Sequence, residues 1–138
     1  MAMKLGNLEN NNFLFGEVNY CKPASGEDIG HCVDAWLGNI PLAWRKRRIS
    51  IKKWGDISIR YKLEITGTKT EAQKMLDGEC WAIFYFFQFT DAIVICKVDD
   101  IITCLQDKKF ITKLNPDSGR TWGAYIKLAD IPHLIQYL

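Results

Sequence analysis

The most regular pattern of apolar and polar residues in the chain runs from residue 56 to residue 65. Apolar side chains occupy every second position, namely Ile57, Ile59, Tyr61, Leu63 and Ile65, and polar side chains occupy the positions between them. Because successive side chains of a strand point to opposite faces, this alternation predicts a strand with one buried face.

A short helix is predicted directly after this strand. The sequence TEAQ places Thr70 as a helix N-cap and Gln73 three residues later, which is the pattern of a capping box. Gly78 marks the expected end of the helix.

Two almost continuously apolar runs follow, from Cys80 to Phe89 and from Ala92 to Val98. Uninterrupted apolar sequence is typical of strands that are buried on both faces, and the aromatic and β-branched content favours strand over helix. We therefore expect two central strands, paired as a hairpin.

The C-terminal sequence predicts several smaller elements. Asp99 is expected to cap a brief helix, a strand is expected near residues 110–114, and NPDSG predicts a turn. A second strand is expected over 121–128, followed by a terminal turn of helix capped by Asp130.

Upstream, residues 31–48 predict two strands joined at Gly38 and Asn39, since Gly-Asn suits a two-residue hairpin loop. Asp34 is placed on the first strand, and a run of basic residues ends the second. With a short helix or turn near Glu27, the element order predicts an α/β (α+β) fold with a mixed β-sheet flanked by short helices.

Length and composition are those of one folded domain. The chain has 138 residues, 48% apolar and 25% charged, so we expect a single domain over 1–138 with a ragged end at 1–12. No apolar run is long enough to cross a bilayer, and the N-terminus lacks the apolar block of a signal peptide. A cytoplasmic location is therefore expected.

The cysteines show no pattern of pairing. Their number, five, is odd and no CxxC motif occurs, so a disulfide framework or a structural zinc site is poorly supported. Buried free thiols are expected at Cys21, Cys32, Cys80, Cys96 and Cys104.

Positive charge is concentrated in one segment. Six of the nine residues from 45 to 53 are basic, and residues 35–55 contain no acidic residue, which leaves 12 basic and 16 acidic residues elsewhere. A positive patch on a mildly acidic body indicates a polyanion or an acidic protein surface as partner. A plain solvated edge strand is the alternative, although fewer basic residues would serve it.

Residues 27–48, EDIGHCVDAWLGNIPLAWRKRR, resemble the active-site hairpin of the restriction-endonuclease-like PD-(D/E)XK nuclease superfamily, in particular its small phage-type members. Those proteins place an acidic residue ahead of a strand-borne Asp, then a hairpin, then an acidic-X-Lys triplet on the next strand. The resemblance implies a restriction-endonuclease-like fold in which carboxylates hold Mg²⁺ and a Lys helps to position or activate water. It also implies a phage or other mobile element as the source.

Carried over residue by residue, the resemblance makes Asp34 the first metal-binding acid and Glu27 or Asp28 the upstream acid. The implied metal ligands are Asp34 and Glu27, and the implied catalytic residues are Asp34, Glu27 and Lys46. Each position also has a structural interpretation: Asp34 can brace the turn, and His31 is expected to be a hydrogen-bonded strand residue.

The triplet departs from the family pattern. Ala43, Trp44 and Arg45 stand at its positions, so the second carboxylate is absent and Arg replaces Lys. A guanidinium stays protonated and cannot act as a base, although it can clamp a phosphate. In one alternative the missing groups have migrated to nearby positions, with Asp56 or Glu64 as the acid and Lys46 or Lys62 as the cation. In the other, the fold has lost catalysis and kept binding.

The basic segment is the expected contact surface for nucleic acid, because Arg is the better fork for phosphate. A continued strand puts Arg45 and Arg47 on one side and Trp44 on the other. The predicted nucleic-acid-binding residues are Arg45, Lys46, Arg47, Arg48, Lys52, Lys53 and Trp44. Trp44 and Trp54 either stack on bases or belong to the core, and a buried Leu42 favours the core for Trp44.

The sequence thus predicts a nucleic-acid-binding protein of nuclease-like fold, with DNA favoured over RNA and Mg²⁺-dependent DNA endonuclease activity as its enzymatic form. The alternative is a non-catalytic binding module of the same fold, for example a phage or mobile-element inhibitor that binds a nucleic-acid-handling protein. A third hypothesis is a homodimer whose aromatic strands pair across an interface. Mg²⁺ is expected only if catalysis survives.

Overall fold

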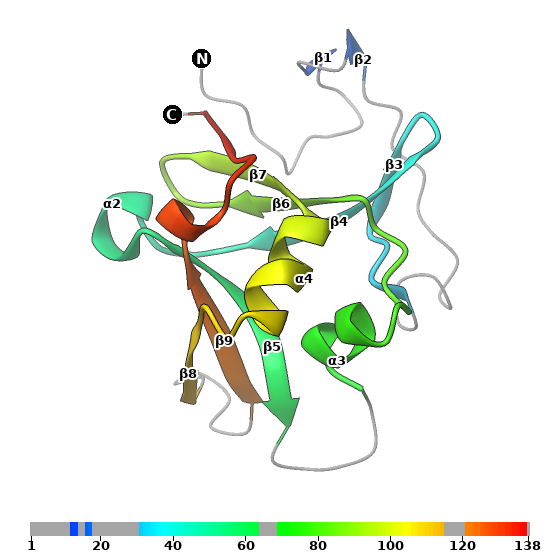
Figure 1. The fold of residues 1–138 in the computed structure, drawn as a ribbon. Helices are drawn as coiled ribbons and strands as arrows, with labels where there is room; N and C mark the ends of the chain where they lie inside the picture. Colours follow the sequence, from blue (N-terminus) through cyan, green and yellow to red (C-terminus); the bar gives the residue numbers. More distant parts are fainter. Residues whose placement is uncertain (1–11, 14–15, 18–30, 64–68, 115–120, 138) are drawn as a thin grey trace.

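The computed structural model describes residues 12–13, 16–17, 31–63, 69–114 and 121–137 (Figure 1). Its largest unit is a five-stranded sheet with the order β10-β7-β6-β4-β3. These strands are β3 (Ala35–Leu37), β4 (Ile40–Lys46), β6 (Phe84–Gln88), β7 (Ile93–Lys97) and β10 (Ile135–Tyr137). β4 and β6 run parallel and the other neighbours antiparallel, which confirms a mixed sheet in an α+β fold.

The hairpin of β3 and β4 forms at the predicted position. Leu37 pairs with Ile40 across a two-residue loop, and Gly38 has a φ of +60°, in the left-handed region that suits glycine. Asp34 immediately precedes β3, and its backbone N–H donates to the Leu42 carbonyl at 2.8 Å. The backbone ladder therefore holds Asp34 beside β4.

A separate three-stranded antiparallel sheet has the order β5-β9-β8. Its strands are β5 (Asp56–Leu63), β9 (Thr121–Lys127) and β8 (Ile111–Leu114). Ile57 and Ile59 are fully buried, which confirms the buried face of β5. The sequence predicts one mixed sheet, and the structure differs from this prediction. β8 and β9 form a separate sheet with β5 and do not pair with the central strands. A small hairpin of β1 (Asn12–Phe13) and β2 (Gly16–Glu17) completes the described strands.

The described helices are short. They are α2 (Ile51–Trp54), α3 (Glu71–Leu76), α4 (Val98–Gln106) and the 3-10 turn η2 (Leu128–Asp130). The predicted capping box of α3 is confirmed, because the Thr70 hydroxyl accepts from the Gln73 N–H and the Gln73 side chain accepts from the Thr70 N–H. None of the helices in the described ranges has the length and apolar character needed to span a bilayer.

Two helix predictions in the C-terminal half of the chain are wrong. β7 runs directly into α4, so the N-cap is Lys97 and Asp99 lies in the first turn. The chain does not end in a helix capped by Asp130, because Ile135 and Tyr137 pair with the edge of β7 and form β10.

The main core lies between the two sheets, where α3 and α4 pack (Figure 1). It includes the buried side chains of Ile59, Phe87 and Ile126, which come from three strands of both sheets. The opposite face of the five-stranded sheet carries a smaller cluster that includes Leu42 and Phe86. β6 is therefore buried on both faces, as its continuous apolar sequence predicts.

The two aromatic-rich strands occupy the middle of the five-stranded sheet. β6 pairs with β4 and β7, and β7 pairs with β6 and β10. The predicted hairpin is confirmed, although β6 begins at Phe84 and not at Cys80. Because both edges of each strand are already paired, edge-to-edge pairing of these strands in a homodimer does not fit the fold.

Candidate functional site

Four polar side chains, Asp34, Arg45, Glu71 and Tyr85, form a central polar cluster at the face of the sheet that α3 covers. Arg45 and Tyr85 lie on the parallel strands β4 and β6, where Tyr85 pairs with Ala43, two residues before Arg45. Side chains two apart on a strand share a face, so the guanidinium and the phenol point to the same side. The cluster thus combines one cation, two acids and one hydroxyl.

Glu71 joins this cluster from α3. It is the first helical residue after the Thr70 cap, so the capping box determines where its side chain leaves the helix. Its Oε1 accepts from the Arg45 guanidinium and, at 3.3 Å, from the backbone N–H of Arg60, while its Oε2 accepts from the Tyr85 hydroxyl. Only 16% of the Glu71 side chain and 24% of the Arg45 side chain are exposed, so this ion pair is shielded from solvent.

Tyr85 acts as a hydrogen-bond donor in the cluster. Burial raises the pKa of its phenol above the ordinary value, and the nearby Arg45 charge offsets only part of this effect. The hydroxyl therefore stays protonated at neutral pH and donates a hydrogen bond to Glu71.

Asp34 faces the backbone of β4 beside this ion pair. Its Oδ2 accepts from the Trp44 N–H at 2.7 Å, and Trp44 is the residue before Arg45. Its charge also contributes to the raised pKa of Tyr85. The hairpin thus brings Asp34 next to the arginine-bearing strand, and one oxygen of its carboxylate braces that strand.

The other acids considered from the sequence are placed differently. Glu27, Asp28 and Glu64 lie outside the described residues. Asp56 is bound to Arg47 and not to the central polar cluster. The sequence did not point to Glu71 as a site residue, although its position after the Thr70 cap marks it as the first residue of the helix.

Arg47 is also held inside the fold. Its Nη1 donates to the Asp56 carbonyl at 2.8 Å and to Asp56 Oδ1 at 2.9 Å. The guanidinium carbon lies 5.4 Å from the centre of the Phe89 ring and 5.8 Å from that of Tyr125. Both charged side chains are only 12% exposed, so a phosphate could reach Arg47 only by displacing this ion pair.

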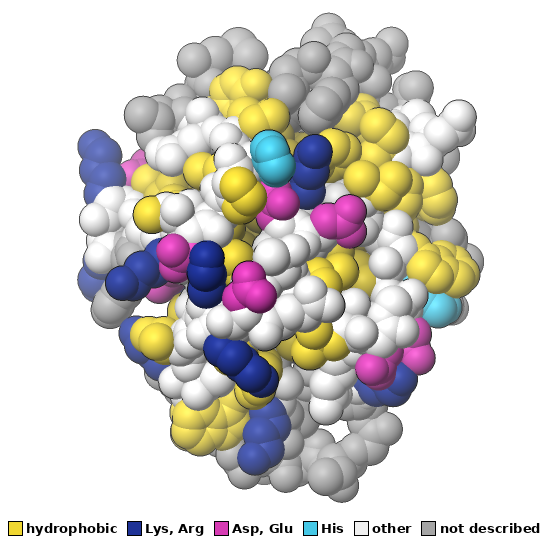
Figure 2. All heavy atoms as spheres, in the orientation of Figure 1, with side chains coloured by type: hydrophobic (Ala, Val, Ile, Leu, Met, Phe, Trp, Pro, Cys, Tyr) yellow, Lys and Arg dark blue, Asp and Glu magenta, His cyan; other side chains and the backbone are white. Residues whose placement is uncertain are grey.

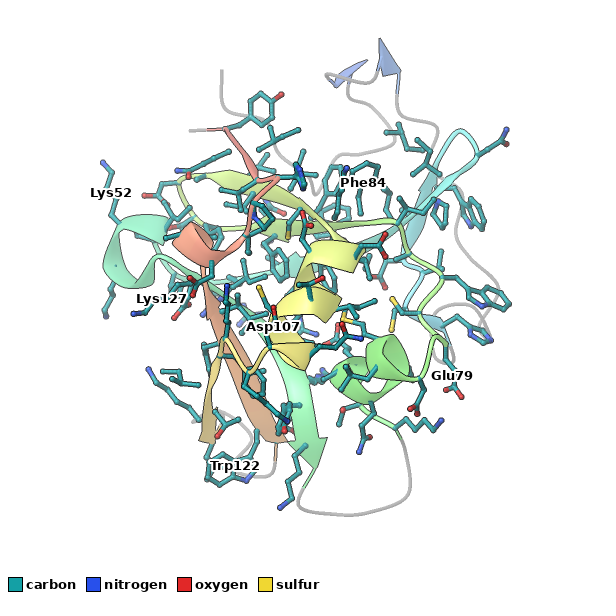
Figure 3. The ribbon with its side chains drawn as sticks, in the orientation of Figure 1. Lys52, Glu79, Phe84, Asp107, Trp122 and Lys127 are labelled. Carbon is teal, nitrogen blue, oxygen red and sulfur yellow. The ribbon has the colours of Figure 1, made fainter. Side chains whose placement is uncertain are left out.

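Four basic side chains remain at the surface, and we call them the basic surface: Lys46, Arg48, Lys52 and Lys53. All four are exposed. They come from the end of β4, the following loop and α2, and Figure 3 shows Lys52 pointing outward from α2. Figure 2 shows dark blue side chains, interleaved with acidic ones, on this side of the molecule, and further cations elsewhere on the same face.

The loop that carries this surface is anchored to the turn between β6 and β7. The Arg47 N–H donates to the Gln88 carbonyl at 2.7 Å, and the Thr90 N–H donates to the Ile49 carbonyl at 3.0 Å. Asp91 accepts from the Ser50 hydroxyl at 2.7 Å and from the Ile51 N–H, and these bonds lower its pKa. The basic side chains therefore project from a backbone with a defined position, with one carboxylate beside them.

Of the two tryptophans near the basic segment, Trp44 has a described side chain. Trp44 is half-buried and packs against the cluster that contains the buried Leu42, which favours the core interpretation. The Trp54 side chain lies outside the described part of the structure. Base stacking by Trp44 therefore competes with its packing in the fold.

The described residues bring no three His, Cys, Asp or Glu side chains together in a group suited to a metal ion. A cavity of about 260 Å³ between α4 and η2 is lined by three acids, Asp100, Asp107 and Asp130, and one cation, Lys109, and so has a net negative charge. Such a lining repels a polyanion, so this cavity does not extend the basic surface.

Comparison of the chain with protein-family models, with curated proteins and with solved structures finds no match in any of the three. The functional assignment therefore depends on the residues and their geometry.

Proposed function

We propose that the protein binds DNA through the basic surface and that its scaffold is restriction-endonuclease-like. The observation that carries this proposal is the group of four exposed cations on one anchored loop and short helix. Cations on a positioned backbone can track phosphates without any base contact, so binding of this kind is expected to be insensitive to sequence.

The nuclease-like part of the proposal is supported by the hairpin. Asp34 precedes the hairpin, and Arg45 occupies the position where the resemblance expects a catalytic Lys. The hydrogen bond from the Trp44 N–H to Asp34 brings the acid against the middle residue of the triplet. This closeness of the acid to the triplet positions supports the proposal.

Binding without cleavage is favoured by the use of the groups in the central polar cluster. Ala43 offers no ligand, and the Glu71 oxygens already accept from Arg45, the Arg60 N–H and Tyr85. A carboxylate that is neutralised by a guanidinium is a weak ligand for Mg²⁺, which prefers free anionic oxygens. The contacts of the central polar cluster therefore favour a role in stabilising the fold over a role in binding Mg²⁺.

The test is DNA binding measured by fluorescence anisotropy with a short labelled duplex in the presence of a chelator. A variant with Lys46, Arg48, Lys52 and Lys53 all changed to Gln is expected to lose most of its affinity. The matched control changes four other exposed cations to Gln: Arg60, Lys62, Lys108 and Lys109. Equal loss in both variants, or no binding by the unchanged protein, would overturn the proposal.

A second candidate is a Mg²⁺-dependent DNA endonuclease, and one observation favours it: two carboxylates, Asp34 and Glu71, flank the Arg45 end of β4. Glu27 stays a predicted ligand, and Lys46 a predicted catalytic residue at the exposed end of the same strand. This candidate requires plasmid nicking that depends on Mg²⁺ or Mn²⁺ and is lost in Asp34→Ala and Glu71→Gln. Binding that is unaffected by chelator and by Asp34→Ala, without nicking, supports the binding module.

A further inference from the structure

The segments that carry Cys32 and Cys80 lie side by side. The Trp81 N–H donates to the His31 carbonyl at 3.0 Å, and His31 Nδ1 lies 2.8 Å from the Glu79 carbonyl oxygen. The His31 and Trp81 rings are stacked with centroids 3.6 Å apart. These three contacts tie the segment ahead of β3 to the segment after α3.

The Cys32 and Cys80 thiols are neighbours where these two segments meet. The neighbouring Cys32 thiol, the Ala82 backbone and the Lys74 charge together lower the pKa of Cys80. A lowered pKa increases the fraction of Cys80 that is thiolate at neutral pH. Cys80 is half-buried and Cys32 is buried, so an oxidant meets the more nucleophilic sulfur first.

The other two described cysteines have different surroundings. The Cys96 thiol donates to the Tyr85 carbonyl, and the Cys104 thiol donates to the Asp130 carbonyl. Both are buried, and burial raises the pKa of each. They are therefore suitable internal controls for the reactivity of Cys80.

We propose that Cys32 and Cys80 form a reversible intramolecular disulfide when the protein meets a peroxide. The Cys80 thiolate attacks one oxygen of hydrogen peroxide, the O–O bond breaks, and Cys80 sulfenic acid and hydroxide result. The Cys32 sulfur then attacks the sulfenic sulfur, and the Cys32 proton and the sulfenic hydroxyl leave as water. Two thiols are oxidised by one peroxide, and a dithiol reductant reverses the reaction.

The disulfide would act on the segment that positions Asp34. Cys32 has a φ of +63°, a conformation that residues other than glycine rarely adopt, and it lies two residues before Asp34. A covalent bond to Cys80 would join this segment to the connection between α3 and β6 and raise the urea midpoint of unfolding.

The test uses the full reduced chain, a small excess of hydrogen peroxide and peptide mapping by mass spectrometry. A Cys32–Cys80 cross-linked peptide that disappears on reduction is expected, with the same result in Cys104→Ser. In Cys32→Ser, Cys80 sulfenic acid is expected to react with dimedone. Cross-links that mainly involve Cys21, or oxidation without a Cys32–Cys80 cross-link, would overturn the proposal.

A second measurement does not depend on any variant. Iodoacetamide should label Cys80 in the unchanged protein at least about tenfold faster at pH 7 than Cys96 or Cys104, because only the thiolate reacts. Equal rates at the three positions would also overturn the proposal.

Discussion

The guanidinium of Arg45 on β4 donates to the carboxylate of Glu71, the first residue of α3. This ion pair links the central sheet to the helix that closes the main core, and it spans 26 positions of sequence. It also removes from the surface one of the arginines that the sequence suggests for phosphate binding.

The first prediction concerns the stability that this pair provides. Glu71→Ala removes the carboxylate that accepts from Arg45 and from the Tyr85 hydroxyl, and both groups are shielded from solvent. We therefore expect the free energy of unfolding to fall by about 2 kcal/mol. Glu71→Gln keeps an acceptor of the same shape and should cost less. Urea denaturation followed by tryptophan fluorescence measures both.

A double-mutant cycle separates the charge from the shape. Arg45→Met alone leaves the Glu71 carboxylate uncompensated, whereas Arg45→Met combined with Glu71→Gln removes both charges and should recover part of the loss. Lys69→Gln, which breaks exposed ion pairs to Asp77 and Glu79, is the control and should leave the urea midpoint unchanged. Strictly additive single effects would mean that the Arg45–Glu71 contact contributes nothing.

The second prediction concerns the cap of α3. Thr70→Ala removes the acceptor for the Gln73 N–H and the donor to the Tyr61 carbonyl, so a loss of about 1 kcal/mol in unfolding free energy is expected. Thr70→Ser keeps the hydroxyl and should retain most of that stability. If the Ser and Ala variants unfold at the same urea concentration, the Thr70 hydroxyl does not contribute to the stability of the protein.

The third prediction concerns alkaline pH. Because burial raises the pKa of Tyr85 in the folded state, its contribution is complete below the unfolded pKa of about 10 and is lost as the pH rises above it. Above that pH the unfolded chain releases the phenol proton while the folded chain retains it. Tyr85→Phe should therefore lose less stability than the unchanged protein between neutral and strongly alkaline pH. Parallel urea midpoints for the two proteins across this range would contradict the assignment.

Local features of the fold were predictable because neighbouring residues decide them. Gly38 and Asn39 form a two-residue loop, and Thr70 and Gln73 form a capping box, at the positions that the sequence indicates. Both depend on contacts within a few residues, which a single sequence displays directly.

The ion pairs that Arg45 and Arg47 form within the fold could not be predicted in this way. The partners of Arg45 and Arg47 are Glu71 and Asp56, and they come from other elements. A run of basic residues in a sequence does not show which of them form ion pairs with acids from other elements. Alternation on β4 correctly separates Arg45 from Trp44, but only tertiary packing decides that Arg45 faces α3.

The end of the chain shows the same limit. A turn of helix after Asp130 satisfies local preference, yet residues 135–137 pair with the free edge of β7. The availability of that edge depends on the order of all the other strands, and the sequence near residue 130 carries no sign of it.

The most direct test of the proposed function is the salt dependence of DNA affinity. Each phosphate contact on duplex DNA contributes about −0.9 to the slope of log affinity against log salt. The unchanged protein should show a steep negative slope, which becomes shallower by about 0.9 for each contacting residue among Lys46, Arg48, Lys52 and Lys53 that is changed to Gln. The control variant with Arg60, Lys62, Lys108 and Lys109 changed should keep the slope of the unchanged protein, and an identical slope in all three proteins would contradict the proposed surface.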